Sequence, residues 1–486
     1  MGRIYTGLIL SALWGAGCGD TTEPVATEPI ERHVDGSRLK AQVISTSDGL
    51  RWFQRVYDSQ RQATCLWQKA APDGAYYCVD DGVGLVSRGG SHFSHDDEYT
   101  DAECTDPIAD LFQTPGPNTF IRRSDDPCEG LQRFHSVGEP WTGAYYRRNQ
   151  DGDCVREPLG HSTHYRIGPE LVTGDHFVRG TLREKQSGGG IKAYVIAGED
   201  GSETFESLQD TTHDTNCVVN RARDGKLRCL PSSEPRGWLA SVSVDPTCTE
   251  PALTTFTPRA CTRPRFSLMS DGDDACSPNL KVIAVGEEVT QVYAPASAVD
   301  PTCRPLTPGS REGRYYRAGA EVPATSWPEA KEIDLKAHGR LIVRGAEVAG
   351  AVKVPARLFD TQLGTECFFN PDASGTERCF PAGHGIDLKL GYFADAACTT
   401  RVSPVFPAPC TDGGYAVFVD FAQGPRLRYR AFHLGPQHEG PVYVVQSDGA
   451  QAGSCAELEG APPASVYEVG AEIEATSLIE GTESMN

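Results

Sequence analysis

The residue types best suited to chemistry cluster in one short stretch, SHFSHDDEY at 91–99. It carries His92, His95, Asp96 and Asp97 in close succession. Imidazole nitrogens and carboxylate oxygens together are ligands for divalent transition metals. The pattern therefore marks these four residues as candidate metal ligands, and a solvated surface loop is the alternative interpretation.

Other polar motifs are weaker candidates. His161 and His164 lie three positions apart in HSTHY, and on a β-strand that spacing would place them on opposite faces. The acidic turns QDGDC (150–154) and SDGDDAC (270–276) lack the twelve-residue calcium pattern that ends in glutamate. We interpret the acidic stretches as hairpin turns.

The motifs of common hydrolases and nucleotide-binding enzymes are absent from the chain. It contains no G-x-S-x-G, no H-E-x-x-H and no G-x4-G-K-[ST]. Sixty-six acidic residues also single out no carboxylate pair for glycoside hydrolysis without geometry. We therefore assign no catalytic residue and expect no cofactor.

The chain has seventeen cysteines, and we expect disulfides between them to hold its elements in place. So many cysteines are typical of exported proteins, because cytosolic proteins rarely carry disulfides. No Cys-x2-Cys pair favours a zinc site. Three cysteine pairs flank a turn dipeptide, which predicts hairpin disulfides between Cys65 and Cys78, Cys217 and Cys229, and Cys367 and Cys379.

The remaining cysteines allow two pairing schemes. Sequential pairing leaves Cys104 and Cys455 single, whereas nested pairing leaves Cys128 and Cys410 single. In either scheme the single cysteines lie in the first and last parts of the chain, and they could meet only in a closed ring. The sequential pairs would be Cys128 with Cys154, Cys248 with Cys261, Cys276 with Cys303, and Cys398 with Cys410.

The same landmarks recur three times along the chain, about 150 residues apart. Each copy has the hairpin cysteine pair, then an Asp shortly before a Cys-Thr, then two hydrophobic-x-x-Gly motifs. The Asp-containing landmarks are DAECTDP at 101–107, VDPTCTEP at 244–251 and ADAACTTR at 394–401. The histidine-rich stretch occurs in the first copy alone, and a pattern confined to one copy is where a function could have been added.

Short runs rich in β-branched and aromatic residues alternate with Asp-Gly and Ser-Gly turns, and helical periodicity is nearly absent. This predicts an all-β fold of three tandem, disulfide-rich repeats. A single repeat with so many turns would have a thin core, so we favour a β-propeller-like ring in which neighbours share core. A linear array of β modules is the alternative.

Composition limits the possible partners. The chain is 39% hydrophobic and 23% charged, which allows a substantial core. Acidic residues outnumber basic ones 66 to 45, giving a net charge of −21. Nucleic acid is therefore not an expected partner, because phosphate binding needs a basic surface.

The N-terminus has the features of an export signal. Arg3 supplies positive charge, residues 4–14 form an apolar run too short to span a bilayer, and small residues precede Cys18. This pattern resembles the lipobox of bacterial lipoproteins, although the position three before the cysteine is usually Leu and here is Gly15. The resemblance implies that Cys18 is acylated and anchors the protein in a membrane, and Gly19 favours the outer membrane.

These observations give the expected domains and function. The domains are a signal peptide at 1–17, lipidated Cys18 with an acidic tether at 18–37, β repeats at 38–175, 176–325 and 326–480, and a tail at 481–486. The pattern resembles cysteine-rich surface lipoproteins of unknown function. We expect a binding, adhesion or structural protein of the cell envelope with an unknown envelope or extracellular ligand. An exported hydrolase acting on glycans or peptides, with its site in a propeller-like cleft, is the alternative.

Overall fold

The computed structural model describes most of the chain from Glu28 to Met485. The described residues are 28–70, 72–80, 98–111, 120–126, 128, 130–148, 153–157, 163–232, 242–255, 263–270, 279–295, 302–306, 314–382, 384–387, 391–405, 414–420, 427–445, 454–458 and 465–485. Within them, helix is confined to α1 (Thr173–His176) and the 3₁₀ turns η1 (Ala324–Ser326) and η3 (Ala475–Ser477). The predicted all-β class is confirmed.

Within the described residues, one 16-stranded sheet forms the centre of the molecule. Its strands come from three segments of the chain and from both ends. The first segment holds β2 (Leu39–Thr46), β3 (Arg51–Asp58), β4 (Ala63–Lys69) and β5 (Tyr76–Asp80). The second holds β13 (Arg179–Gly188), β14 (Ile191–Gly198), β15 (Glu203–Asp210), β16 (Thr215–Arg221) and β17 (Leu227–Pro231). The third holds β24 (Ala330–His338), β25 (Leu341–Val348), β26 (Val352–Asp360), β27 (Thr365–Pro371) and β28 (Glu377–Pro381). The two end strands are β1 (His33–Val34) and β37 (Glu480–Met485).

The three segments share their strand register. Each has a β-bulge at the same column of one strand pair: after Gln42 in β2–β3, after Tyr194 in β14–β15 and after Arg344 in β25–β26. A bulge inserts one residue and bends the strand locally, so the three segments bend at corresponding places.

The C-terminal strand β37 completes the first segment. β13 and β24 each pair with the strand that follows them, whereas the first segment has no such strand before β2. β37 occupies that position, with Gly481 opposite Thr46, as Gly180 faces Gly198 in the second segment. Residues 481–485, which the sequence placed in a tail at 481–486, thus lie in the central sheet, where they pair with β2.

Neighbouring segments are joined by equivalent contacts. The backbone N–H of Cys78 donates to the carbonyl of Val178, that of Cys229 to Pro328, and that of Cys379 to Ile479, with N···O distances of 2.9–3.0 Å. The pair between β17 and the residue before β24, Arg228 with Glu329, links the two ends of the sheet path. The last strand of the path thus lies next to the first, and this bridge connects them.

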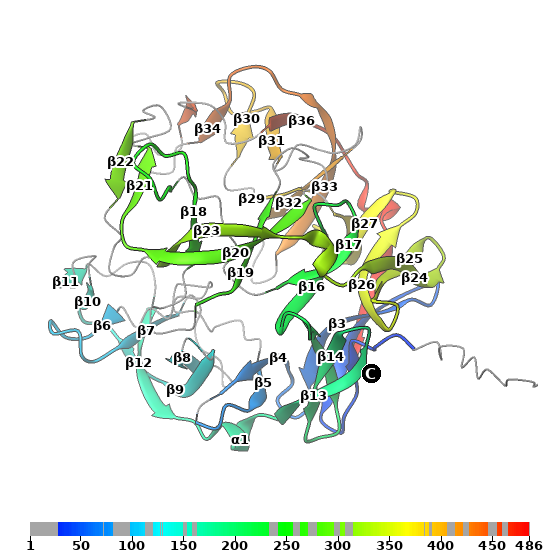
Figure 1. The fold of residues 1–486 in the computed structure, drawn as a ribbon, viewed down its shortest axis with the longest axis horizontal. Helices are drawn as coiled ribbons and strands as arrows, with labels where there is room; N and C mark the ends of the chain where they lie inside the picture. Colours follow the sequence, from blue (N-terminus) through cyan, green and yellow to red (C-terminus); the bar gives the residue numbers. More distant parts are fainter. Residues whose placement is uncertain are drawn as a thin grey trace, which may run out of the picture.

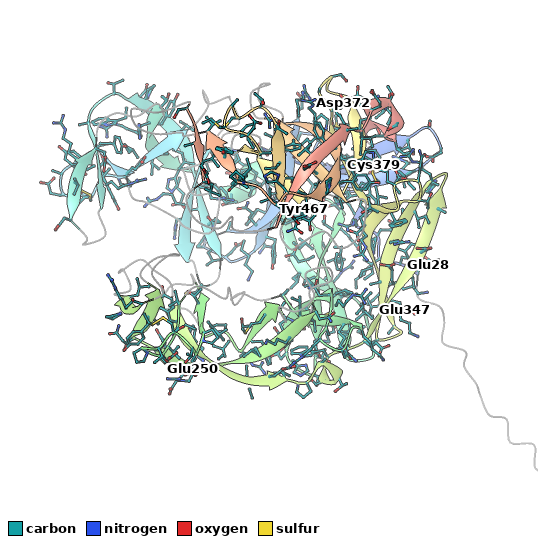
Figure 2. The ribbon with its side chains drawn as sticks, turned by 90° about the horizontal axis from the view of Figure 1, so that it is seen from above. Glu28, Glu250, Glu347, Asp372, Cys379 and Tyr467 are labelled. Carbon is teal, nitrogen blue, oxygen red and sulfur yellow. A yellow bond between two sulfur atoms is a disulfide. The ribbon has the colours of Figure 1, made fainter. Side chains whose placement is uncertain are left out.

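Part of the predicted tether packs on this sheet. β1 pairs with β15, and the backbone N–H of Ile30 donates to the carbonyl of Lys353. Ile30 is 3% exposed and belongs to an apolar cluster shared with the second and third segments. Glu28 lies on the same side of the molecule as Glu347 of β25 (Figure 2). The described end of the expected tether at 18–37 therefore contacts the sheet through Ile30 and β1.

Three outer regions follow the three segments along the chain. In Figure 1 the first lies at the lower left, the second runs from the left to the middle, and the third lies towards the top and contacts β27 and β28. The first outer region (98–170) contains β6 (Glu98–Tyr99), β7 (Ile108–Leu111), β8 (Phe120–Asp126), β9 (Leu131–Trp141), β10 (Tyr145–Arg148), β11 (Cys154–Glu157) and β12 (Thr163–Glu170). The second (242–322) contains β18 (Ala252–Thr255), β19 (Phe266–Ser270), β20 (Leu280–Val289), β21 (Val292–Pro295), β22 (Cys303–Leu306) and β23 (Arg314–Val322). The third (384–472) contains β29 (His384–Asp387), β30 (Tyr392–Phe393), β31 (Arg401–Val405), β32 (Tyr415–Asp420), β33 (Arg428–Gln437), β34 (Tyr443–Val445), β35 (Cys455–Glu457) and β36 (Ser465–Glu472).

No closed propeller is found among the described residues. A propeller needs separate blades around an axis, but here the hairpins of all three segments hydrogen-bond edge to edge in one large antiparallel sheet. β5 pairs with β13, and β28 pairs with β37. The blades of a propeller would not be joined by such hydrogen bonds between edge strands. Local sequence patterns could not reveal this pairing, because it joins strand edges that are far apart along the chain.

Six disulfides connect described cysteines. Three close the hairpins that sequence spacing predicted: Cys65–Cys78, Cys217–Cys229 and Cys367–Cys379, with Cα–Cα distances of 5.2–5.3 Å. The other three lie in the outer regions: Cys104–Cys154, Cys248–Cys303 and Cys398–Cys455. Disulfides in this number belong to an exported protein in an oxidising environment.

The outer disulfides exclude sequential pairing and agree with the outer pairs of the nested scheme. Cys104 and Cys455, the single cysteines of the sequential scheme, each bond within their own outer region. Cys128 is also disulfide-bonded. The candidates Cys261, Cys276 and Cys410 lie outside the described residues.

One turn recurs at the outer disulfides. Cys104, Cys248 and Cys398 all have left-handed backbone, with φ of 52–55°. A non-glycine residue adopts this conformation only at a cost. In the third turn the Asp395 carboxylate accepts hydrogen bonds from the backbone N–H groups of Thr399 and Thr400. Asp101 and Asp245 accept equivalent bonds, so carboxylate and disulfide together hold each turn.

Helices of the described part are all short, and none has the length or apolar character needed to cross a bilayer.

Candidate functional site

One position distinguishes the three junctions between segments. Trp67, Val219 and Phe369 each lie two residues after a hairpin cysteine, and each stands opposite the second cysteine of its own disulfide in the strand register. Trp67 and Phe369 reach across to the next segment. Because the three residues share one register, Val219 is the position where a small aliphatic side chain replaces an aromatic ring.

The two aromatic junctions are filled. The Trp67 indole Nε1–H donates to Thr204 Oγ1 of the second segment at 2.9 Å. A Cβ added at Gly180 would lie 2.7 Å from the Trp67 ring, and one at Gly481 would lie 2.8 Å from the Phe369 ring. Glycine is needed at both places, because only its bare backbone lets the ring lie so close.

The middle junction has smaller residues on both sides. Ala330 occupies the position of Gly180 and Gly481, since no ring requires space there. Ala346 occupies the position of Ile44 and Ile196. With Val219 opposite, the junction between the second and third segments lacks the bulk that closes the other two.

A cavity of about 450 Å³ lies at this junction. Small-molecule sites typically enclose 300–1,000 Å³. The cavity is lined by Phe205, Glu206, Ser207, Leu208, Asn216, Cys217, Val218, Val219, Leu227 and Ser232 of the second segment or directly after it, and by Glu332, Gly345, Ala346, Val354, Ala356 and Arg357 of the third. Leu208, Ala346 and Val354 also belong to the apolar cluster beneath it.

The polar lining residues of the cavity are Glu206, Ser207, Asn216, Ser232, Glu332 and Arg357. Arg357 hydrogen-bonds to Glu332, and its Nε lies 2.7 Å from Glu366 Oε1. Glu206 stands at the β15 bulge and is an exposed residue. Partial desolvation raises the pKa of its carboxyl, and the charge of Lys69 opposes this change. The site therefore combines an apolar floor with a carboxyl of raised pKa and a guanidinium held between two carboxylates.

The residues singled out by sequence analysis lie elsewhere. The candidate ligands His92, His95, Asp96 and Asp97 are outside the described residues, as is Cys18. His161 is outside them too, while His164 is buried on β12 of the first outer region. No group of three or more metal-binding side chains is found within the described ranges.

Sequence reasoning missed Val219, although a signal was present. Aligning the hairpin cysteines places Cys-x-Trp, Cys-x-Val and Cys-x-Phe in one column. The valine in that column is the feature that opens the junction. Ala346 had no comparable marker, because its equivalence to Ile44 and Ile196 depends on strand register.

A family model describes more than half of this chain. It covers residues 20–311 and represents DUF7481, a family of unknown function. The chain belongs to this family. No curated protein and no solved structure matches it.

The match to DUF7481 includes the first segment, the first outer region, the second segment and most of the second outer region. It therefore includes the wall of the cavity that carries Val219 and Glu206, and it ends before β24, which begins the opposite wall.

Proposed function

We propose that this DUF7481 member is an exported binding protein of the bacterial cell envelope that holds a small amphipathic molecule between its second and third segments. The observation that carries the proposal is the single unfilled junction, where Val219 replaces the aromatic wedge of Trp67 and Phe369. A scaffold that needed only stability would gain from closing this junction, because unfilled apolar volume is destabilising.

The repeated architecture supports this reading. In the proposal the three segments and their outer regions are copies of one unit closed into a ring, with β37 supplying the missing first strand. Matching bulges, hairpin disulfides and junction contacts support the equivalence. The junction with Val219 differs from the other two, and we interpret this difference as a binding function added to the repeated unit.

The lining chemistry defines the class of ligand. Leu208, Val219, Leu227 and Val354 offer apolar contact. The carboxyl of Glu206 is suited to a hydrogen-bond donor such as an amine or a hydroxyl. The ligand would therefore have an apolar body and a neutral or basic polar end, in the size range of a small metabolite or lipid fragment.

The proposed location follows from the N-terminal resemblance. An acylated Cys18 would attach the body to the outer membrane, and the tether before Glu28 would separate it from the bilayer. Lipid modification supplies the multiple acyl chains that stable anchoring requires.

A titration tests the binding function. N-phenyl-1-naphthylamine, an apolar fluorescent amine, should bind the parent at one site. The double variant Val219→Trp with Ala330→Gly recreates the first junction and should weaken binding at least about tenfold. Val445→Trp adds the same ring at an exposed position of the third outer region and serves as the matched control. Equal binding by the double variant and the parent would contradict the proposal.

A hydrolase is the second candidate, because two carboxylates, Glu206 and Glu332, line the same cavity. Paired-carboxylate hydrolysis needs one protonated and one ionised group, and the raised pKa of Glu206 suits the former. Glu332 is engaged by Arg357, which favours binding over catalysis. Turnover of a glycan or peptide library that disappears in Glu206→Gln would support the hydrolase instead.

A further inference from the structure

The first outer region carries Glu98, Glu157 and His164 at positions that hold Val, Leu or Tyr in the other two. Strand register shows which positions correspond in the three regions. Tyr99 pairs with Pro107 in the first region, and Ser243 pairs with Pro251 in the second. Phe393 pairs with Arg401 in the third, so Tyr99, Ser243 and Phe393 are equivalent. Glu98 therefore corresponds to Val242 and Tyr392.

Three further positions follow from the same registers. The set in the first region is Glu98, Tyr145, Glu157 and His164; in the second it is Val242, Val292, Leu306 and Tyr315; in the third it is Tyr392, Val442, Leu458 and Val466. The second and third sets each form part of one hydrophobic cluster. The second and third regions therefore pack at these positions without a carboxylate or an imidazole.

Glu98 and His164 lie next to each other in the first region. His164 Nε2 is 3.2 Å from Glu98 Oε2, with side-chain exposures of 2% and 12%. The imidazole packs on the Tyr145 ring, with centroids 4.5 Å apart. Glu98 Oε1 faces Arg147 Nη2 at 3.6 Å, so Oε2 is the oxygen directed to the imidazole.

The contact between the two groups lacks the geometry of a hydrogen bond. Neither nitrogen of His164 has a hydrogen-bond partner among the described residues, although Nε2 lies so close to the carboxylate. Burying imidazole and carboxylate costs desolvation free energy unless each finds a partner. Two adjacent ligand atoms at this separation are instead suited to share one ion.

We propose that Glu98 Oε2 and His164 Nε2 bind one divalent transition metal ion in the first outer region. Imidazole with carboxylate suits zinc, cobalt or nickel and is unfavourable for magnesium or calcium, which prefer all-oxygen sites. Arg147 would hold the second carboxylate oxygen and so orient the ligand. The proposal concerns a region remote in sequence from the Val219 cavity and does not depend on it.

Cobalt titration tests the site, because bound Co²⁺ reports its ligand geometry by visible absorption. The full chain with Cys18→Ser is exported to an oxidising compartment, so that no thiolate at position 18 contributes, and any affinity tag is removed. One equivalent of Co²⁺ should bind, and Zn²⁺ should displace it, while Mg²⁺ at millimolar concentration should not.

The matched variant combines Glu98→Val with His164→Tyr, the residues of the second outer region at these positions. It retains an apolar cluster that already exists in this fold and should bind Co²⁺ at least about 100-fold more weakly. His438→Ala removes a half-buried histidine of the third region that lies outside the proposed site, and this variant should bind as the parent does. Parent-like Co²⁺ binding by the double variant, or no Co²⁺ or Zn²⁺ binding by the parent, would overturn the proposal.

A second readout separates metal loss from misfolding. The double variant should keep the parent's disulfides and thermal midpoint without metal, and Zn²⁺ should raise the midpoint of the parent alone. A zinc-dependent rise in the double variant that equals the parent's would also overturn the proposal.

Discussion

Phe368 and Phe369 are adjacent in β27, yet the structure assigns them different roles. Phe369 is 5% exposed and wedges against Ile44 and Gly481, whereas Phe368 is 37% exposed. Sequence pattern alone could place one of the two in the core, because neighbours on a strand face opposite sides. It could not show that the buried ring fills a junction with the other end of the chain.

Replacing the wedge should open a second unfilled junction. Phe369→Val is expected to cost about 2–3 kcal/mol of unfolding free energy, through lost apolar burial and a residual cavity. Equilibrium denaturation measures the effect. Phe368→Val removes the same atoms from an exposed site and should change stability by less than about 0.5 kcal/mol. Equal losses in the two variants would refute the assignment of Phe369 as a wedge.

The aspartates of the three outer turns, Asp101, Asp245 and Asp395, should make the stability of the fold depend on pH in the acidic range. Hydrogen bonds from Thr400 and Thr399 lower the pKa of Asp395 to about 2 from its ordinary 3.8. Because the folded pKa is depressed, the stabilisation is complete above the unfolded value and is lost as pH falls toward about 2. Similar hydrogen bonds lower the pKa of Asp101 and Asp245.

Asp395→Asn should therefore be less stable than the parent above about pH 5, and the difference should shrink between about pH 4 and pH 2. Denaturant unfolding of both proteins across this pH range is the measurement. A stability difference that stays constant down to pH 2 would show that ionisation of Asp395 does not stabilise the turn.

At the scale of elements, β37 is the strand on which the central sheet depends most. It pairs with β2 on one side and β28 on the other, so its removal exposes two strand edges. Exposed edges promote aggregation. Sequence analysis assigned these residues to a tail, because a short polar strand such as EGTESM has little periodic signal of its own.

Truncation after Ile479 should lower the thermal midpoint by more than about 10 °C and produce soluble aggregates. Scanning calorimetry and size-exclusion chromatography measure these effects. Deleting residues 19–27 serves as the control and should leave the midpoint unchanged. It retains the described contacts of this part of the chain with the sheet, which start at Glu28, whose carbonyl accepts a hydrogen bond from Gln186. An unchanged midpoint after the C-terminal truncation would contradict the role of β37.

The elements also show what sequence could predict. Hairpin disulfides such as Cys217–Cys229 were predictable because both partners and the turn lie within one short stretch. Local periodicity also indicated the all-β class. The outer disulfide Cys248–Cys303 was left open, because its partners are separated by 55 residues and their approach depends on tertiary packing. The cavity depends on a contact between segments, which local patterns do not encode.

At the scale of the whole molecule, the disulfides indicate an exported protein, and the N-terminal resemblance to a lipobox predicts a lipid anchor at Cys18. Cys18→Ala should release soluble protein from the membrane fraction, because the variant cannot be acylated at that position. Fractionation of cells expressing the parent and the variant, followed by immunoblotting, measures the outcome. A variant that sediments with membranes as fully as the parent would rule out the lipid anchor.

We propose that the junction of the second and third segments is open and binds a ligand. Photolabelling of the full chain with an apolar diazirine amine, followed by mapping of the modified peptides, tests this proposal most directly. Labels should concentrate in peptides containing 205–219 and 345–357, and they should disappear in the variant Val219→Trp with Ala330→Gly. Equal labelling around Trp67, Val219 and Phe369, or labelling that the double variant leaves unchanged, would contradict the claim.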